Sequence, residues 1–128
     1  MRIGVDVMGG DLAPYPILEG ALAATSKLES DDVVVLYGDE DIIYEGIANT
    51  TLGHAKVEVV ATTESISMDE SPVDAVRGKQ DSSLVVMCKA ASRKAENPLD
   101  AVISAGNTGA FVAGSQMYLR RLDGVHRP

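Results

Sequence analysis

The run Val33–Tyr37 (Val-Val-Val-Leu-Tyr) restricts the fold more than any other stretch, because it contains no polar position that could face solvent. A strand of this composition is buried on both faces, as in parallel sheets that carry helices on either side. Apolar runs at Arg2–Val7, Val57–Ala61 and Ala101–Ile103 predict three more strands. The sequence therefore predicts a layered α/β protein in which helices connect these strands.

Helical patterns separate the four predicted strands. The expected helix from Pro72 to Gly78 should turn Val73 and Val76 inward. Strands that alternate with helices imply right-handed crossovers and a mostly parallel sheet with flanking helices. The expected helices run from about Pro14 to Leu28, from Asp39 to Asn49, from Pro72 to Gly78, from a cap at Asp81 or Ser82 to Ala95, and from Thr108 to Leu122.

Length and charge narrow the class of protein. A chain of 128 residues is large enough for one α/β domain with a core. The net charge of −8 argues against nonspecific binding of nucleic acid or anionic membrane by the whole surface. No apolar run approaches the roughly 20 residues of a membrane span, and Asp6 follows the N-terminus too closely for a signal peptide. We expect a soluble, cytoplasmic domain without a nucleic-acid partner.

The stretch Ser104–Ala110 follows the last predicted strand and opens the last predicted helix. The first turn of a helix has backbone N–H groups without intrahelical partners and the positive end of the helix dipole, so it suits an anion. Gly106 and Gly109 let a ligand approach the backbone, and Asn107 or Thr108 can cap the helix. The stretch is either a phosphate or carboxylate cradle or an ordinary strand-to-helix turn.

A second glycine turn, at Gly9 and Gly10, follows the first predicted strand. Ligands of open parallel sheets gather outside the carboxyl ends of the strands. Both glycine turns lie at such ends, and so does the loop after Val57–Ala61, which leads to Arg77 and Lys79. The topology predicts that these three regions meet at one rim.

Charged residues near these turns allow two interpretations each. Arg77 and Lys79, close to Ser82 at a helix start, offer charge and donors to a phosphate, or they form a solvated helix end. Asp11 either orients a ligand or caps the turn. Asp6 lies within a strand and needs a partner there, which favours a structural role.

Covalent or metal chemistry finds no support in the sequence. Cys88 lies on the apolar face of a helix and is expected to pack as a small hydrophobe. His54 and His126 lack the spacing of metal ligands. Ser104 lacks the surrounding sequence of a nucleophile elbow. We therefore expect neither a metal nor a cofactor.

Several short segments, spread in order over the whole chain, carry a resemblance to a known family. They are Met1–Asp11 with Ala13-Pro14, Met68–Val73, Ala75–Arg77 with Lys79, Ser82-Ser83, Ser104–Ala110, and Arg121, Gly124 and Arg127-Pro128. Through these segments the chain resembles the bacterial acyl carrier protein (ACP):phosphate acyltransferases, the fatty acid/phospholipid synthesis protein PlsX family. Leu12 departs from this family, which usually has histidine there, and Gly78 and Gln80 interrupt a stretch that is usually more basic.

The resemblance implies a reaction in which a long-chain acyl group moves from ACP to inorganic phosphate, giving acyl phosphate for phospholipid synthesis. It implies a fold similar to that of isocitrate and isopropylmalate dehydrogenases. It also implies a homodimer, soluble or peripheral to the inner face of the membrane, that hands its product to a glycerol-3-phosphate acyltransferase. The chain covers less than half of a typical member, so residues 1–128 form either a single α/β domain or the N-terminal portion of a larger enzyme.

The expected site follows from the matched motifs. Asp11 and Asn107 are the expected catalytic residues, with Asp11 orienting a donor or accepting a proton. Two alternatives stay open: a short-chain phosphate acyltransferase that uses acyl-CoA, and a noncatalytic fragment that binds phosphate or dimerises. Arg77 and Lys79 are expected to neutralise phosphate or to meet the acidic surface of ACP. The residues expected to bind phosphate or the developing oxyanion are Gly9, Gly10, Arg77, Lys79, Ser82, Gly106, Thr108 and Gly109.

Overall fold

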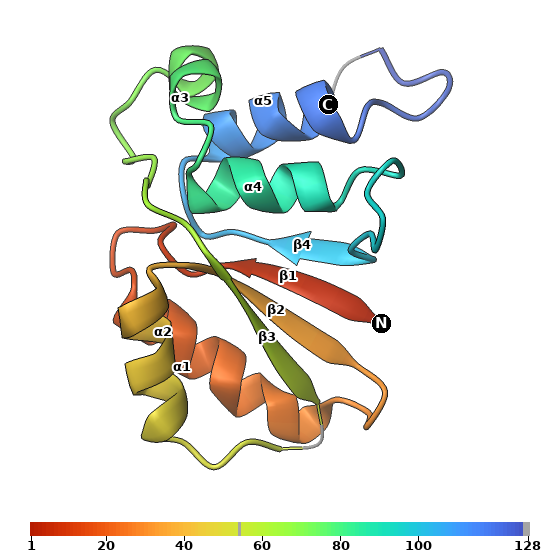
Figure 1. Ribbon diagram of the computed structural model, residues 1–128. Coiled ribbons are helices and arrows are strands. Elements are labelled where there is room, and N and C mark those ends of the chain that lie inside the picture. Colours follow the sequence, from red (N-terminus) through yellow and green to blue (C-terminus); the bar gives the residue numbers. More distant parts are fainter. Residues whose placement is uncertain (54, 127–128) are drawn as a thin grey trace.

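The computed structural model of the protein describes residues 1–53 and 55–126 and contains one four-stranded sheet (Figure 1). The strand order is β3-β2-β1-β4, and every neighbouring pair is parallel. This confirms the predicted α/β architecture. The sheet was expected to be mostly parallel, and among the described residues it is parallel throughout. The strands are β1 (Arg2–Asp6), β2 (Val33–Gly38), β3 (Lys56–Ala61) and β4 (Ala101–Ile103).

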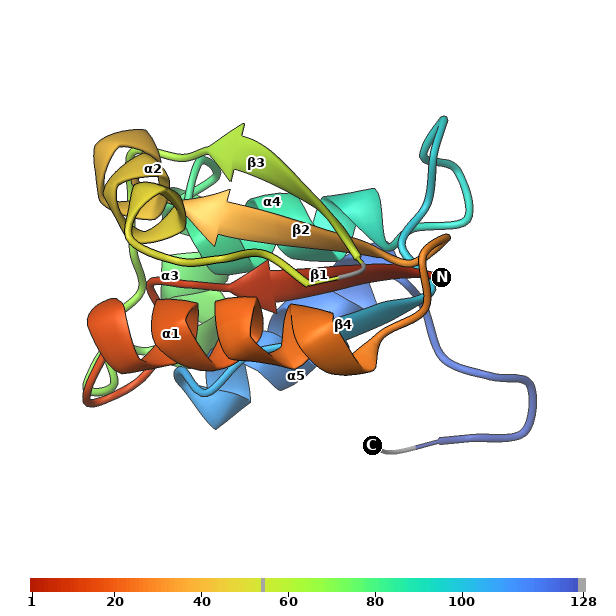
Figure 2. The same cartoon turned by 90° about the horizontal axis from the view of Figure 1, so that it is seen from below.

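Helices cover both faces of the sheet, as Figures 1 and 2 show. Helices α1 and α2 lie on one face, whereas α4 and α5 lie on the other, with α3 packed against α5. None of the helices in the described part of the chain is long and apolar enough to cross a bilayer. Their bounds are α1 (Tyr15–Ala24), continued by the 3-10 turn η1 (Thr25–Lys27), α2 (Glu40–Ala48), α3 (Pro72–Gly78), α4 (Ser83–Ala90) and α5 (Thr108–Tyr118).

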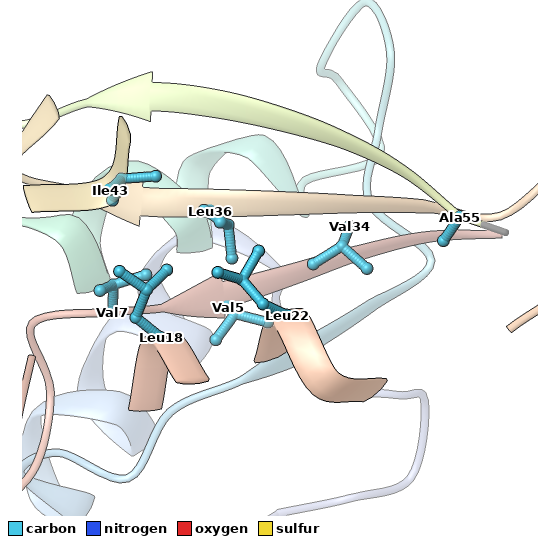
Figure 3. Packing of buried hydrophobic residues seen from close by; sticks show 8 residues of the cluster. All are labelled: Val5, Val7, Leu18, Leu22, Val34, Leu36, Ile43 and Ala55. Atoms are coloured by element: carbon cyan, nitrogen blue, oxygen red, sulfur yellow. The ribbon is translucent and has the colours of Figure 1, made fainter. Parts of the chain in front are cut away.

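Strand β2 is buried on both faces, as its unbroken apolar sequence predicts. Val34 and Leu36 point toward α1 and α2, where they join the cluster drawn in Figure 3. Val35 and Tyr37 point the other way and pack with Met87 of α4. The alternation of side chains along a strand therefore supplies one apolar layer to each face of the sheet.

Two predicted helices end earlier than the apolar pattern indicated. Helix α4 ends at Ala90 rather than near Ala95, because the chain turns back and the Leu99 N–H donates to the Ala90 carbonyl at 3.1 Å. Helix α5 ends at Tyr118 rather than at Leu122, because Arg120 adopts a left-handed φ of 69°. Such a conformation does not continue a right-handed helix.

The expectation that Val73 faces inward is wrong. In α3 the buried residues are Ala75 and Val76, whereas Val73 is 43% exposed. Residues of a helix are about 100° apart around its axis, so Val73 lies about 200° away from Ala75. The side of α3 that is buried is therefore centred between Ala75 and Val76, and only Val76 of the predicted pair belongs to it.

Candidate functional site

The order of the strands points to the carboxyl ends of β1 and β4 as the place where a ligand would bind. From β1 the chain leads through α1 to β2 on one side of the sheet, whereas from β4 it leads into α5 on the opposite face. Connections that leave adjacent parallel strands in opposite directions open a crevice at the carboxyl ends, where α/β proteins bind ligands. The two glycine turns that the sequence singled out follow these two strands.

The glycine turns touch each other at this crevice. A Cβ atom added to Gly106 would lie 3.1 Å from the Cα atom of Gly9. Gly10 has a φ of 129°, and a Cβ atom there would lie 3.2 Å from the Ala105 carbonyl oxygen. Backbone meets backbone at these points, so a side chain at either glycine would force the neighbouring turn to shift. The predicted convergence of the two turns is confirmed.

The loop after β3 reaches the same rim. Together with the first glycine turn it encloses an open pocket of about 320 Å3. The third predicted region therefore joins the other two, as topology predicted. The pocket is lined by Met8, Gly10, Ala13 and Pro14 on one side and by Ser65, Ile66, Ser67 and Met68 on the other.

Asn107 holds the start of α5 to this loop. Its Oδ1 atom accepts a hydrogen bond from the Ala110 N–H at 3.0 Å, which makes it the predicted helix cap. Its Nδ2 atom donates to the carbonyl oxygens of Ser67 and Glu70 at 3.2 and 3.1 Å. The side chain is only 6% exposed, so its polar atoms are used within the protein and position the loop.

Backbone N–H groups at the start of α5 are oriented differently from one another. The Gly106 N–H donates to the Ser104 hydroxyl at 3.1 Å, so Gly106 supplies close contact rather than a free donor. Within the described residues, the N–H groups of Thr108 and Gly109 donate to no protein acceptor, and both residues are exposed. These two donors at the positive end of α5 remain for an anion.

Asp6 lies beneath the meeting point of the turns and is only 1% exposed. Its Oδ1 atom accepts from the Ser83 hydroxyl at 2.5 Å, and its Oδ2 atom accepts from the Ser104 hydroxyl at 2.7 Å. Burial raises the pKa of Asp6, and these two hydrogen bonds, with those from the Met8 and Gly9 N–H groups, oppose that rise. The predicted structural role of Asp6 fits this arrangement.

The two cations that the sequence offered to a phosphate, Arg77 and Lys79, have different surroundings. The Lys79 ammonium binds the Glu70 carboxylate at 2.7 Å and the Ser65 carbonyl at 2.8 Å, so it ties down the loop. This ion pair lowers the pKa of Glu70. The buried Ser82 hydroxyl donates to the Lys79 carbonyl at 2.8 Å. Arg77 is exposed and forms no ion pair with a described residue.

Of the remaining candidates, Asp11 is exposed next to Gly10 at the edge of the first turn. Cys88 is fully buried, and burial raises the pKa of its thiol to about 11, which confirms that it packs as a hydrophobe. His126 is exposed, and His54 lies outside the described residues. No group of three His, Cys, Asp or Glu side chains in residues 1–53 and 55–126 is arranged to hold a metal.

Sequence reasoning did not find Ser83 and Ser104 as the partners of Asp6. A carboxylate inside a strand signals that hydrogen-bond donors lie nearby, but the donors are 77 and 98 residues away along the chain. Ser104 is the first residue after β4, and Ser83 is the first residue of α4. Both positions reach Asp6 only once the sheet has formed.

Comparisons with known proteins agree on one family. The sequence profile of the family described as fatty acid synthesis protein matches residues 1–128. Proteins called phosphate acyltransferase from Caldicellulosiruptor bescii and Clostridioides difficile are each 41% identical to the chain over all 128 residues, and one from Brevibacillus brevis is 46% identical. The chain spans 36–37% of the length of these relatives. The chain belongs to the fatty acid synthesis protein family.

Proposed function

We propose that this chain contributes the phosphate-binding part of a phosphate acyltransferase. The reaction moves a long-chain acyl group from ACP to inorganic phosphate and gives acyl phosphate and the free carrier thiol. The observation that carries the proposal is the contact between the two glycine turns at the crevice between β1 and β4. The names of the relatives, phosphate acyltransferase, support it.

Phosphate is placed at the start of α5 in this proposal. The N–H groups of Thr108 and Gly109, which donate to no acceptor among the described residues, and the helix dipole attract its negative charge. Gly9, Gly10 and Gly106 let the two turns approach each other closely beside the start of this helix. Asn107 serves by fixing the start of α5 against the loop after β3.

The chemistry that the site must perform is modest. A thioester is already activated, and phosphate supplies its own nucleophilic oxygen, so no protein nucleophile is required. The protein has to hold the two reactants in line and to stabilise the oxyanion that forms on the thioester carbonyl. Asp11, exposed beside Gly10, would orient a donor or accept a proton, and Arg77, exposed and unpaired among the described residues, would meet phosphate or the acidic surface of ACP.

The proposal extends to the larger protein. The relatives are almost three times as long as this chain, which supports a working enzyme in which residues 1–128 form the N-terminal portion of a larger α/β unit. We propose a fold similar to that of isocitrate and isopropylmalate dehydrogenases, a homodimer, and a cytoplasmic location at or near the inner face of the membrane. From there, acyl phosphate would pass to a glycerol-3-phosphate acyltransferase.

The test is phosphate-dependent consumption of palmitoyl-ACP, with hydroxylamine trapping the acyl phosphate. It is run on the 128-residue chain and on the complete product of its gene, with palmitoyl-CoA and acetyl-CoA as competing donors. Turnover with palmitoyl-ACP by the complete gene product supports the proposal. If the 128-residue chain alone shows no turnover, essential groups lie outside residues 1–128. Faster turnover with acetyl-CoA would favour the short-chain alternative. Phosphate binding without turnover in either protein would favour the noncatalytic one.

A further inference from the structure

We propose that Asp6 is a positioning residue for phosphate, acting through the Ser104 hydroxyl on the turn that leads into α5. This inference rests on the proposed function, because it assumes that phosphate binds at the start of that helix. Asp6 itself lies behind the backbone of both glycine turns and is 1% exposed, so it does not reach the ligand.

The first step is the direction of the hydrogen bonds between Asp6 and Gly106. The Ser104 hydroxyl donates its one proton to Oδ2 of Asp6 at 2.7 Å, so its lone pairs remain for the Gly106 N–H, which donates to it at 3.1 Å. The carboxylate thereby sets the orientation of the hydroxyl, and the hydroxyl holds the peptide plane at Gly106. Gly106 lies two residues before Thr108, so the position of this peptide plane helps to set where the N–H groups of Thr108 and Gly109 begin α5.

The same carboxylate also contacts the other glycine turn, at Gly9. A Cβ atom at Gly9 would lie only 2.3 Å from Oδ2 of Asp6, so the backbone of this turn rests directly on the carboxylate. The Ser83 hydroxyl, at the start of α4, binds Oδ1 at 2.5 Å and fixes the carboxylate from below. One side chain therefore links β1, α4 and both turns of the crevice.

The cost of this arrangement indicates that it serves more than packing. A buried carboxylate loses its hydration, and a buried apolar side chain would stabilise the sheet without that loss. The negative charge also repels an anion bound nearby. Asp6 therefore helps phosphate binding only through geometry. Loss of its charge should weaken phosphate binding if the role is geometric, whereas it would strengthen binding if only electrostatic repulsion mattered.

The test measures binding of inorganic phosphate by equilibrium dialysis, together with hydrogen exchange at the Gly106 amide. The variants are Asp6→Asn and Ser104→Ala, and the control is Thr25→Val. Thr25 is also fully buried, and its hydroxyl donates to the Leu22 carbonyl at the far end of α1. The melting temperature of each variant is measured, so that phosphate binding is compared between variants that lose a similar amount of stability.

The expected result is a phosphate dissociation constant about tenfold higher in Asp6→Asn and Ser104→Ala, as for the loss of one positioned hydrogen bond. Gly106 exchange should be faster in both, and Thr25→Val should bind phosphate as the parent does. Equal or tighter binding by Asp6→Asn would overturn the role of Asp6, and so would an equal loss in Thr25→Val. A parent chain that binds no phosphate would instead overturn the phosphate site of the proposed function, and the role of Asp6 with it.

Discussion

At Asn107 a single amide group caps a helix and fastens a loop. The Oδ1 atom caps α5, and the Nδ2 atom holds the carbonyl groups of the loop after β3. Asn107→Ala removes both contacts, whereas Asn107→Ser keeps a good cap and removes only the loop contacts.

We expect Asn107→Ala to lower the free energy of unfolding by about 1–2 kcal/mol more than Asn107→Ser does, which is the size of a lost cap. Urea denaturation measures this difference. Both variants should also require more phosphate for binding and should be cleaved faster by protease near Ser67. An unchanged phosphate requirement in both would remove Asn107 from the site.

Asp6 should leave a signature in the pH dependence of stability. Its folded pKa is raised by burial above an unfolded value of about 3.9, so the folded state binds this proton more tightly than the unfolded state. The free energy of unfolding of the parent, relative to Asp6→Asn, should therefore fall as pH rises from about 3.9 through the folded pKa, and then level off. Urea denaturation of both proteins at a series of pH values measures it, and a difference that rises with pH would contradict the assignment.

Cys88 should be nearly inert in the folded chain. Burial raises the pKa of its thiol to about 11, and the nearby Asp6 charge acts in the same direction. Because the thiolate is the reactive form, an aromatic disulfide reagent at pH 7.5 should react far more slowly with the folded chain than with the chain in urea. Equal rates under the two conditions would show that α4 does not cover this thiol.

At the scale of elements, two helical glycines differ in their surroundings. A Cβ atom at Gly20 in α1 would meet no atom within 4 Å, whereas one at Gly109 in α5 would lie 2.6 Å from Cγ of Pro72 in α3. Gly20→Ala should therefore stabilise the chain by about 0.5–1 kcal/mol through helix propensity.

Gly109→Ala should instead destabilise the chain by about 1–3 kcal/mol, because the rigid proline ring forces α3 away from α5. Chemical denaturation of the two variants side by side measures both signs. Stabilisation by Gly109→Ala would mean that α3 and α5 are not in the contact described here.

The sequence predicted element types well and element ends poorly, for identifiable reasons. The unbroken run at β2 and the alternation of strands with helices depend on local composition, so the parallel sheet could be foreseen. The end of α4 at Ala90 depends on Leu99 returning to the same helix, and the inward side of α3 depends on its contact with α5. Such tertiary contacts leave no mark in the local pattern.

For the molecule as a whole, the place of the site was predictable and its internal contacts were not. Parallel strands bring the three predicted regions to one rim, so their meeting followed from the alternation of strands and helices. The order β3-β2-β1-β4, which makes β1 and β4 neighbours, came only from the structure. The pairing of Asp6 with Ser83 and Ser104, and of Lys79 with Glu70, depends on side-chain packing in three dimensions. Lys79, an expected phosphate ligand, is therefore engaged with a loop residue in this structure.

The location of phosphate on the whole molecule is the most direct test of this account. The measurement is the change in backbone amide chemical shifts of the 128-residue chain as inorganic phosphate is added. We predict saturable shifts at Gly10, Thr108 and Gly109, with smaller ones at Gly106. Shifts confined to the surface pocket formed by Arg93, Lys94, Arg120 and Arg121, at the opposite end of α5, would contradict the account. So would the absence of any saturable shift.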